Sequence, residues 1–246
     1  MATQGKITTI LFDCDNTLVQ SEPIGFEVSA EIVNEILALH GIDNTKFTGP
    51  QLQREFVGMT FQATMNAIQA KYGLTLDLSL DELDRYAAME ETRVVAKLLG
   101  PGQPLLPCVG VNAVLKELSS RGGLYRLAVV SGSGPSRIAA SLAAAGQAEF
   151  FAEGDIFSAV NMASKPNPAV YKHALKSLGV DAKNCVAIED SKSGVLAARG
   201  AGLLTLGYTG AYELEERPAL EKVLVEAGCM TVMSDWAEFL GFLDGL

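Results

Sequence analysis

Residues 7–17 read ITTILFDCDNT, and this stretch sets the architecture that the rest of the chain follows. Its first half is a run of apolar and β-branched residues with the length of a strand buried on both faces. Two carboxylates, Asp13 and Asp15, come directly after the run, and Thr17 follows them. No basic residue stands next to them in the sequence, so a more distant group has to offset the two negative charges.

Further short apolar runs share the length and β-branched content of this first one, and they lie at residues 126–131, 185–189, 203–207 and 230–233. Amphipathic helical patterns separate them, at residues 112–122, 135–146, 168–179, 194–202 and 218–228. Several of these patterns begin after Ser, Asn or Pro and end at Gly, as capped helices do. Alternation of strand and helix predicts an α/β fold with a doubly wound parallel sheet and right-handed crossovers.

The segment 20–102 interrupts this alternation, because it contains helical patterns and no convincing strand. Four amphipathic stretches fill it, and we interpret it as a four-helix insert placed after the first strand. We therefore predict a core domain of residues 1–19 and 103–246 and a helical domain of residues 20–102. The turn-rich entry (19–23) and exit (100–107) are typical of paired hinges.

Composition narrows the class of protein and its partners. The 246 residues carry a formal charge of −10, which disfavours binding to the phosphate backbone of a nucleic acid. No apolar run approaches the roughly 20 residues of a membrane span, and MATQGK leads into the first strand without a leader-like pattern. Four scattered cysteines without CxxC spacing suit a reducing compartment. We expect a cytoplasmic protein, with a monomer favoured, that acts on a small molecule.

Polar residues gather at the ends of the predicted strands or just before them. They are Asp13, Asp15, Ser131, Gly132, Ser133, Lys165, Glu189, Asp190 and Ser191. The carboxyl ends of parallel strands share one edge of the sheet, and ligands of such folds bind there. Four carboxylates at one edge would repel one another strongly without a cation. The sequence therefore predicts a Mg²⁺ site formed by the four carboxylates, with Lys165 as a second positive charge.

Each of these residues also has a plainer interpretation. An Asp after a strand commonly caps a helix or forms a turn, the serines could be turn residues before a helix, and Lys165 alone could be a surface charge. Their occurrence together at successive strand ends favours the site over these alternatives. Cys14 lies between the two aspartates, and we predict a packing role for it over a redox role.

Four ordered motifs, DCDNT, VVSGS, SKPNP and IEDSKSG, resemble those of the haloacid dehalogenase superfamily. The similarity covers nearly the whole chain and is greatest to the phosphatase branch with a small helical cap, which includes β-phosphoglucomutase and sugar-phosphate phosphatases. The resemblance implies a Rossmann-like core, a helical cap over residues 20–102 and Mg²⁺ as cofactor. It places Glu189 and Asp190 on the metal side, together with Asp13 and Asp15.

The resemblance also implies catalytic roles. Asp13 is implied as the nucleophile that forms an aspartyl-phosphate, and Asp15 as the general acid and base. Ser131, the backbone N–H of Gly132 and Lys165 are implied as ligands of the phosphate. A carboxylate is a weak nucleophile, but phosphoryl transfer depends mostly on positioning and charge neutralisation, which these groups supply.

From these residues we predict a Mg²⁺-dependent phosphatase acting on a small phosphate monoester such as a sugar or polyol phosphate. Dehalogenases of the superfamily lack an acid at the position of Asp15, so dehalogenation is disfavoured. A phosphomutase of the β-phosphoglucomutase type is one alternative, although Gly25 stands where such enzymes carry a histidine. A non-catalytic sensor of phosphorylated metabolites is another, disfavoured because both aspartates and the lysine are present.

The stretch EFVGMTFQ (55–62) is predicted to shape the pocket for the leaving group. Its candidate specificity residues are Phe56, Gly58, Met59 and Phe61, with Gly58 at the bend. The stretch carries no Lys or Arg to hold a second phosphate, which favours hydrolysis over isomerisation.

Overall fold

The structure is a computed structural model, and it describes residues 5–56, 59–101 and 105–246. The chain divides into two compact units: Met1–Gln20 with Leu105–Leu246, termed the core unit, and Ser21–Pro104, termed the helical unit.

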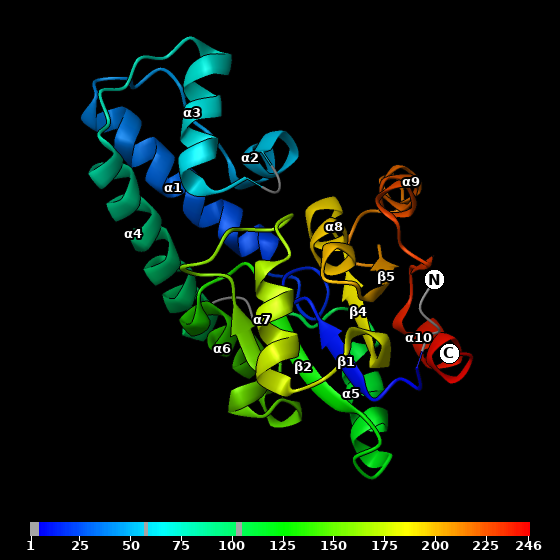
Figure 1. Cartoon of the computed structure of the whole chain (residues 1–246). Coiled ribbons are helices and arrows are strands. Elements are labelled where there is room, and N and C mark those ends of the chain that lie inside the picture. The colour runs from blue at the N-terminus through cyan, green and yellow to red at the C-terminus, as the bar shows by residue number, and fades with distance from the viewer. Residues whose placement is uncertain (1–4, 57–58, 102–104) are drawn as a thin grey trace. The chain divides into compact units, whose positions relative to one another are not determined.

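A six-stranded parallel sheet in the order β3-β2-β1-β4-β5-β6 forms the centre of the core unit (Figure 1). Its strands are β1 (Thr9–Phe12), β2 (Arg126–Ser131), β3 (Ile156–Ser158), β4 (Cys185–Glu189), β5 (Leu204–Tyr208) and β6 (Thr231–Met233). The strand order extends in both directions from β1, which lies beside β2 and β4. The predicted α/β fold with a doubly wound parallel sheet is confirmed.

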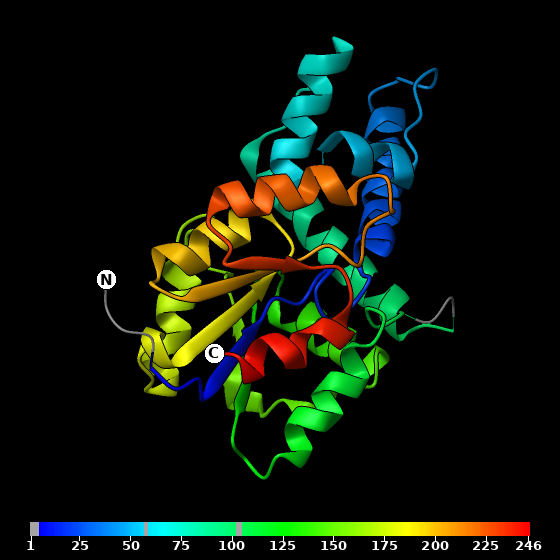
Figure 2. The same ribbon diagram turned by 90° about the vertical axis from the view of Figure 1, so that its right-hand side faces the viewer.

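Helices cover both faces of this sheet (Figure 2). They are α5 (Val111–Ser120), α6 (Pro135–Ala144), α7 (Ala169–Leu178), α8 (Lys192–Gly200), α9 (Arg217–Ala227) and α10 (Phe239–Asp244). Successive side chains of a strand point to opposite faces, so Leu11 packs with buried residues of α7 and α8 while Phe12 stacks near Trp236 and Phe239. Both faces of β1 are therefore buried, as its unbroken apolar run predicts.

The sequence-based prediction of five strands was wrong by one, because β3 was missed. This strand has three residues, IFS, and it pairs with β2 at the edge of the sheet. Three residues are too few for a recognisable alternation or apolar run. The consequence for the site is that Lys165 lies in the connection from β3 to α7, so every predicted site motif of the core unit follows a strand.

The helical unit contains α1 (Glu22–Leu39), α2 (Gly49–Phe56), α3 (Phe61–Tyr72) and α4 (Leu80–Leu99), as predicted. Local chemistry sets several of their ends. The Thr60 side chain caps α3, and Ser79 and Glu82 form a capping box at the start of α4. Among the described residues, no helix combines the length and apolarity needed to cross a bilayer.

Candidate active site

The segment after β1 is a tight loop that fixes Asp13. The backbone N–H of Asp13 donates to the carbonyl of Ile188 at 3.0 Å, so pairing with β4 continues one residue beyond the strand. Further on, the N–H of Leu18 donates to the carbonyl of Cys14 at 2.9 Å, and Asn16 adopts a φ of 56°. Asparagine tolerates this left-handed conformation better than most residues, which permits the sharp turn. The loop therefore reverses direction immediately after presenting Asp13.

Cys14 is buried within this loop. Burial, with the nearby Asp15 and Asp13 carboxylates, raises the pKa of its thiol well above the usual value. A thiol held protonated is a poor nucleophile, which accords with a packing role.

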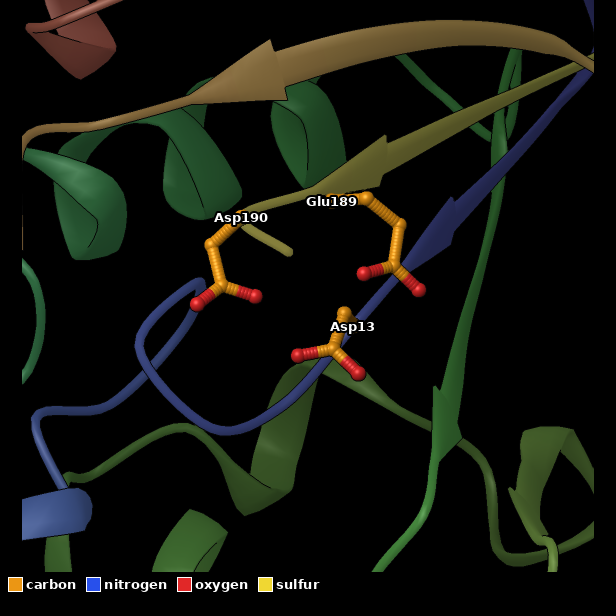
Figure 3. A group of neighbouring side chains, drawn as sticks. All are labelled: Asp13, Glu189 and Asp190. Carbon is orange, nitrogen blue, oxygen red and sulfur yellow. The ribbon is translucent and has the colours of Figure 1, made fainter. Parts of the chain in front are cut away.

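Three buried carboxylates, Asp13, Glu189 and Asp190, converge at the ends of β1 and β4 (Figure 3). Each offers an oxygen, and these oxygens lie within 4.8 Å of one another. The parallel register explains the meeting, because Phe12 pairs with Ile188 and the next residues along both strands are Asp13 and Glu189. Two of the three carboxylates are adjacent in the sequence, since Glu189 is the last residue of β4 and Asp190 follows it, shortly before α8 begins at Lys192.

Lys165 provides the positive charge closest to this group. Its Nζ donates to Oδ1 of Asp13 at 2.6 Å, to Oε1 of Glu189 at 2.7 Å and to the carbonyl of Val130 at 3.0 Å. Burial alone would lower the pKa of Lys165, but the attraction of Asp13 and Glu189 outweighs it and raises that pKa above its usual value. The lysine therefore stays charged and offsets part of the acidic charge.

One lysine does not balance three carboxylates. Burial raises the pKa of Asp13 well above its ordinary value of 3.8, with Lys165 opposing the shift and Glu189 and Asp15 adding to it. Oε2 of Glu189 is also buried, and it has no hydrogen-bond partner among the residues that the structure describes. A buried acidic group with an unsatisfied carboxylate oxygen fits a hard divalent cation, which prefers oxygen ligands.

Asp15 lies in different surroundings. Its Oδ2 accepts hydrogen bonds from Ser133 Oγ at 2.7 Å and from Ser131 Oγ at 3.4 Å, and its Oδ1 lies 3.2 Å from Nη2 of Arg137. The group of three carboxylates does not include Asp15. Its side chain is held by the end of β2, the turn after it and the first turn of α6, and the prediction that it ligates a metal stays a prediction.

The turn after β2 presents hydroxyl and backbone donors. Ser131 ends the strand and is fully buried, and its Oγ accepts a hydrogen bond from the N–H of Ser133 at 3.0 Å. A Cβ added to Gly132 would meet no atom within 4 Å, so its backbone borders open space. α6 begins shortly after, at Pro135, and the N–H groups of a helix start favour anions. This turn is chemically suited to bind a phosphate.

The candidate specificity residues belong to the helical unit and differ in exposure. Phe56 ends α2 and Phe61 begins α3, and both side chains are buried, whereas Met59 is 50% exposed. Gly58 lies outside the described residues. The role of this stretch in specificity stays a prediction.

Sequence reasoning missed three residues that contact the site. Arg137 was counted only as part of a helix pattern, although it lies in the first turn of α6 and reaches Asp15. Tyr171 on α7 donates to Glu189 at 2.6 Å, and Tyr212, in the loop after β5, donates to Asp190 at 2.6 Å. The position of Arg137 two residues after Pro135, close to a predicted anion-binding turn, is a signal that could have revealed it.

Comparison with known families identifies the chain. The family model of haloacid dehalogenase-like hydrolases matches residues 7–202. The chain belongs to this family. The motif-based resemblance and the prediction of a hydrolytic enzyme are therefore confirmed.

Relatives of this hydrolase include proteins with phosphatase names. It is 29% identical to the protein CbbY of Cereibacter sphaeroides over 246 residues, covering 98% of this chain and 96% of the relative. It is 25% identical to the 6-phosphogluconate phosphatase of Escherichia coli K12 over 199 residues, covering 80% of each. The crystal structure of CbbY from Rhodobacter sphaeroides in complex with phosphate superposes with a TM-score of 0.75, at 24% identity and covering 97% and 99% of the two chains. That structural likeness supports the fold.

Proposed function

We propose that this hydrolase is a Mg²⁺-dependent phosphatase that hydrolyses a small phosphate monoester, such as a sugar or polyol phosphate, in the cytoplasm. The observation that carries the proposal is the contact of Asp13 with Lys165 at the end of β1, with Glu189 and Asp190 beside it. A carboxylate beside a buried ammonium is placed for attack on a phosphoryl group, whose own charge needs neutralisation. The name of 6-phosphogluconate phosphatase, a relative of this chain, supports the substrate class.

In the first proposed step an oxygen of Asp13 attacks phosphorus. The new bond joins that oxygen to phosphorus, the bond from phosphorus to the ester oxygen breaks, and the product is an aspartyl-phosphate. Asp15, protonated, gives its proton to the departing alkoxide. Lys165, Ser131 and the N–H of Gly132 hold the phosphoryl oxygens during the transfer.

In the second step water attacks the same phosphorus and the bond to Asp13 breaks. Asp15, now ionised, takes a proton from the attacking water, so one residue serves as acid and then as base. The Oγ of Ser133 and the guanidinium of Arg137, which contact the two oxygens of Asp15, orient its carboxylate between the steps. Inorganic phosphate and the free alcohol are the products.

Asp13, Glu189 and Asp190 are the residues that would hold the Mg²⁺ ion. Bound there, the ion would supply positive charge to the transferring phosphoryl oxygens and allow two anions to approach each other. Their burial and the unpartnered Oε2 of Glu189 support this assignment.

We assign the choice of leaving group to the helical unit as a cap. The support is the sequence alone, which places the apolar stretch around Phe56, Met59 and Phe61 within the insert. The lack of Lys or Arg between residues 57 and 61 favours hydrolysis over transfer to a second position of a sugar.

A panel of phosphate monoesters tests the proposal directly. Release of inorganic phosphate is measured for sugar phosphates and polyol phosphates, with Mg²⁺ and with a chelator in its place. We expect phosphate release from at least one of them with Mg²⁺ and its loss on chelation. Full activity after exhaustive chelation would exclude the metal role, and β-glucose 1-phosphate giving glucose 6-phosphate faster than phosphate would favour the mutase.

A further inference from the structure

Two tyrosine hydroxyls contact the adjacent acids Glu189 and Asp190. Tyr171 comes from α7, which packs on the sheet beside the lysine-bearing connection. Tyr212 comes from the loop that follows β5, the strand next to β4. Two separate elements therefore each bring one phenolic donor to one of the two carboxylates.

The contact of Tyr171 is shielded from water. Its side chain is fully buried, its hydroxyl donates to Oε1 of Glu189 at 2.6 Å, and Glu189 is itself fully buried. The ring also lies below Lys165, whose Nζ is 5.2 Å from the ring centroid. A charge-assisted hydrogen bond in such surroundings is strong, because no water competes for either partner. Tyr171 therefore holds Glu189 with its hydroxyl and contacts Lys165 with its ring.

The hydrogen bonds of Glu189 are unevenly divided between its two oxygens. Oε1 accepts from both Tyr171 and Lys165, while Oε2 has no partner among the described residues. The space beside Oε2 exists because residue 194 is a glycine: a Cβ there would lie 1.7 Å from that oxygen. Two donors on one oxygen prevent the carboxylate from rotating, and the second oxygen remains available.

Tyr212 makes the corresponding contact with Asp190. Its hydroxyl donates to Oδ2 at 2.6 Å, and the side chain is half-buried. Arg217 fixes the loop that carries it, donating to the carbonyl of Tyr212 at 2.9 Å and to that of Gly210 at 3.0 Å. The hydroxyl is thus held by an anchored backbone, although in a more accessible place than Tyr171.

We propose that Tyr171 and Tyr212 are positioning residues of the metal site, each fixing one oxygen of a neighbouring carboxylate so that the acidic group receives a divalent cation in one arrangement. The inference rests on the proposed function, since it assigns Glu189 and Asp190 to the cation. Partners of metal-ligating groups are commonly worth about 10- to 100-fold in metal affinity. Tyr171 contributes more to the metal affinity than Tyr212 does, because its contact with Glu189 is the more deeply buried of the two.

The test measures Mg²⁺ binding itself. Magnesium chloride is titrated into the full chain by calorimetry, without any phosphate ester, for wild type, Tyr171→Phe and Tyr212→Phe. Phenylalanine keeps the ring and removes only the hydroxyl. We expect the dissociation constant to rise about tenfold for Tyr171→Phe and about threefold for Tyr212→Phe. With a substrate found by the panel, kcat at saturating Mg²⁺ should remain within about threefold of wild type.

Tyr208→Phe is the matched control. Tyr208 is a buried tyrosine of the same unit, and its hydroxyl interacts with Cys108. Removing this hydroxyl should leave the Mg²⁺ affinity unchanged. A Tyr171→Phe protein that binds Mg²⁺ within about twofold of wild type would overturn the proposal, as would a loss of kcat at every Mg²⁺ concentration with unchanged affinity. If Tyr171→Phe does not fold, Tyr212→Phe decides, and unchanged affinity in that variant overturns the proposal.

Failure of the proposed function gives a different pattern. A wild-type chain that binds Mg²⁺ but releases no phosphate from any ester contradicts the phosphatase assignment, while the titrations still decide the role of the tyrosines. A wild-type chain that binds no Mg²⁺ overturns the tyrosine proposal, whatever its activity.

Discussion

Asp13 and Asp15 are two residues apart in the sequence, yet they lie in opposite chemical surroundings. Asp13 is buried among other acids, with one lysine as its charged partner. Asp15 is 23% exposed at its side chain and is held by serine hydroxyls and an arginine. Carboxyl groups take different roles in one site when their surroundings differ in this way. The difference favours Asp13 as nucleophile and cation ligand and Asp15 as the residue that moves protons.

The largest effect is expected from Asp13→Asn. The amide cannot attack phosphorus, so phosphate release should fall by at least about 10³-fold, while circular dichroism shows an unchanged fold. Asp181→Asn is the control and should retain full activity, because Asp181 is exposed and precedes the start of β4, whereas Glu189 lies at the other end of that strand. An Asp13→Asn protein that keeps more than about a tenth of the wild-type rate would contradict the assignment.

Asp15→Asn should lower the rate of phosphate release less than Asp13→Asn does, and the size of the loss should depend on the leaving group. Loss of a general acid is worth about 10²- to 10⁴-fold for an alkyl ester, whose alkoxide needs a proton. p-Nitrophenyl phosphate has a leaving group stable as an anion, so formation of the aspartyl-phosphate from it should be much less affected. Single-turnover kinetics with both substrates separate this step from the later attack of water. Equal losses for the two esters would mean that Asp15 does not protonate the leaving group.

Arg137→Met should lower kcat by a smaller factor than Asp15→Asn does, because Arg137 acts through Asp15. Removing the guanidinium takes away one of the groups that hold the Asp15 carboxylate, and the misplaced acid should lower kcat by about tenfold with little change in Mg²⁺ affinity. Arg126→Met is the matched control, since Arg126 pairs with Asp155 at the start of β2, the end of that strand opposite to Ser131. Equal losses of kcat in the two variants would show that the effect of Arg137 is one of general stability.

Much of this arrangement could be predicted because it depends on topology. A parallel sheet gathers the carboxyl ends of its strands at one edge, so Asp13 and Glu189 were expected together from their places at the ends of apolar runs. Lys165 was expected there as a residue before the next predicted strand and from the motif resemblance, because β3, the strand that it follows, was missed. The contacts that distinguish Asp13 from Asp15 could not be predicted in the same way. Side-chain direction after a strand depends on the loop, and the loop here turns sharply at Asn16.

Tyr171, one of the two tyrosines that were missed, shows a related limit of prediction from sequence. In the sequence, Tyr171 is an apolar-face residue of a helix pattern, and its ring does pack in the core. Its hydroxyl meets Glu189, a residue 18 positions away, only because α7 packs across the sheet. Periodicity reports which face of a helix is buried, but it does not report which polar atom a buried side chain touches.

The smallest expected effect is a dependence of stability on pH that belongs to Asp13. Burial raises the pKa of this carboxyl in the folded protein above its ordinary value of 3.8. Between that value and the raised pKa, the folded chain binds a proton that the unfolded chain has released. Stability therefore falls as pH rises through this interval.

Thermal unfolding in the presence of a chelator measures this dependence. The contribution of Asp13 should make the melting temperature of wild type a few degrees lower at about pH 8 than at about pH 5. Asp13→Asn removes the titrating group, so its melting temperature should vary less over the same interval and should exceed that of wild type at the higher pH. Asp15→Asn should keep most of the wild-type slope, because burial, the largest cause of the raised pKa of Asp13, remains and only the smaller contribution of the Asp15 charge is lost. If Asp13→Asn and wild type show the same slope, Asp13 does not carry the unbalanced charge of the acidic group, and the contrast between the two aspartates would have to rest on catalysis alone.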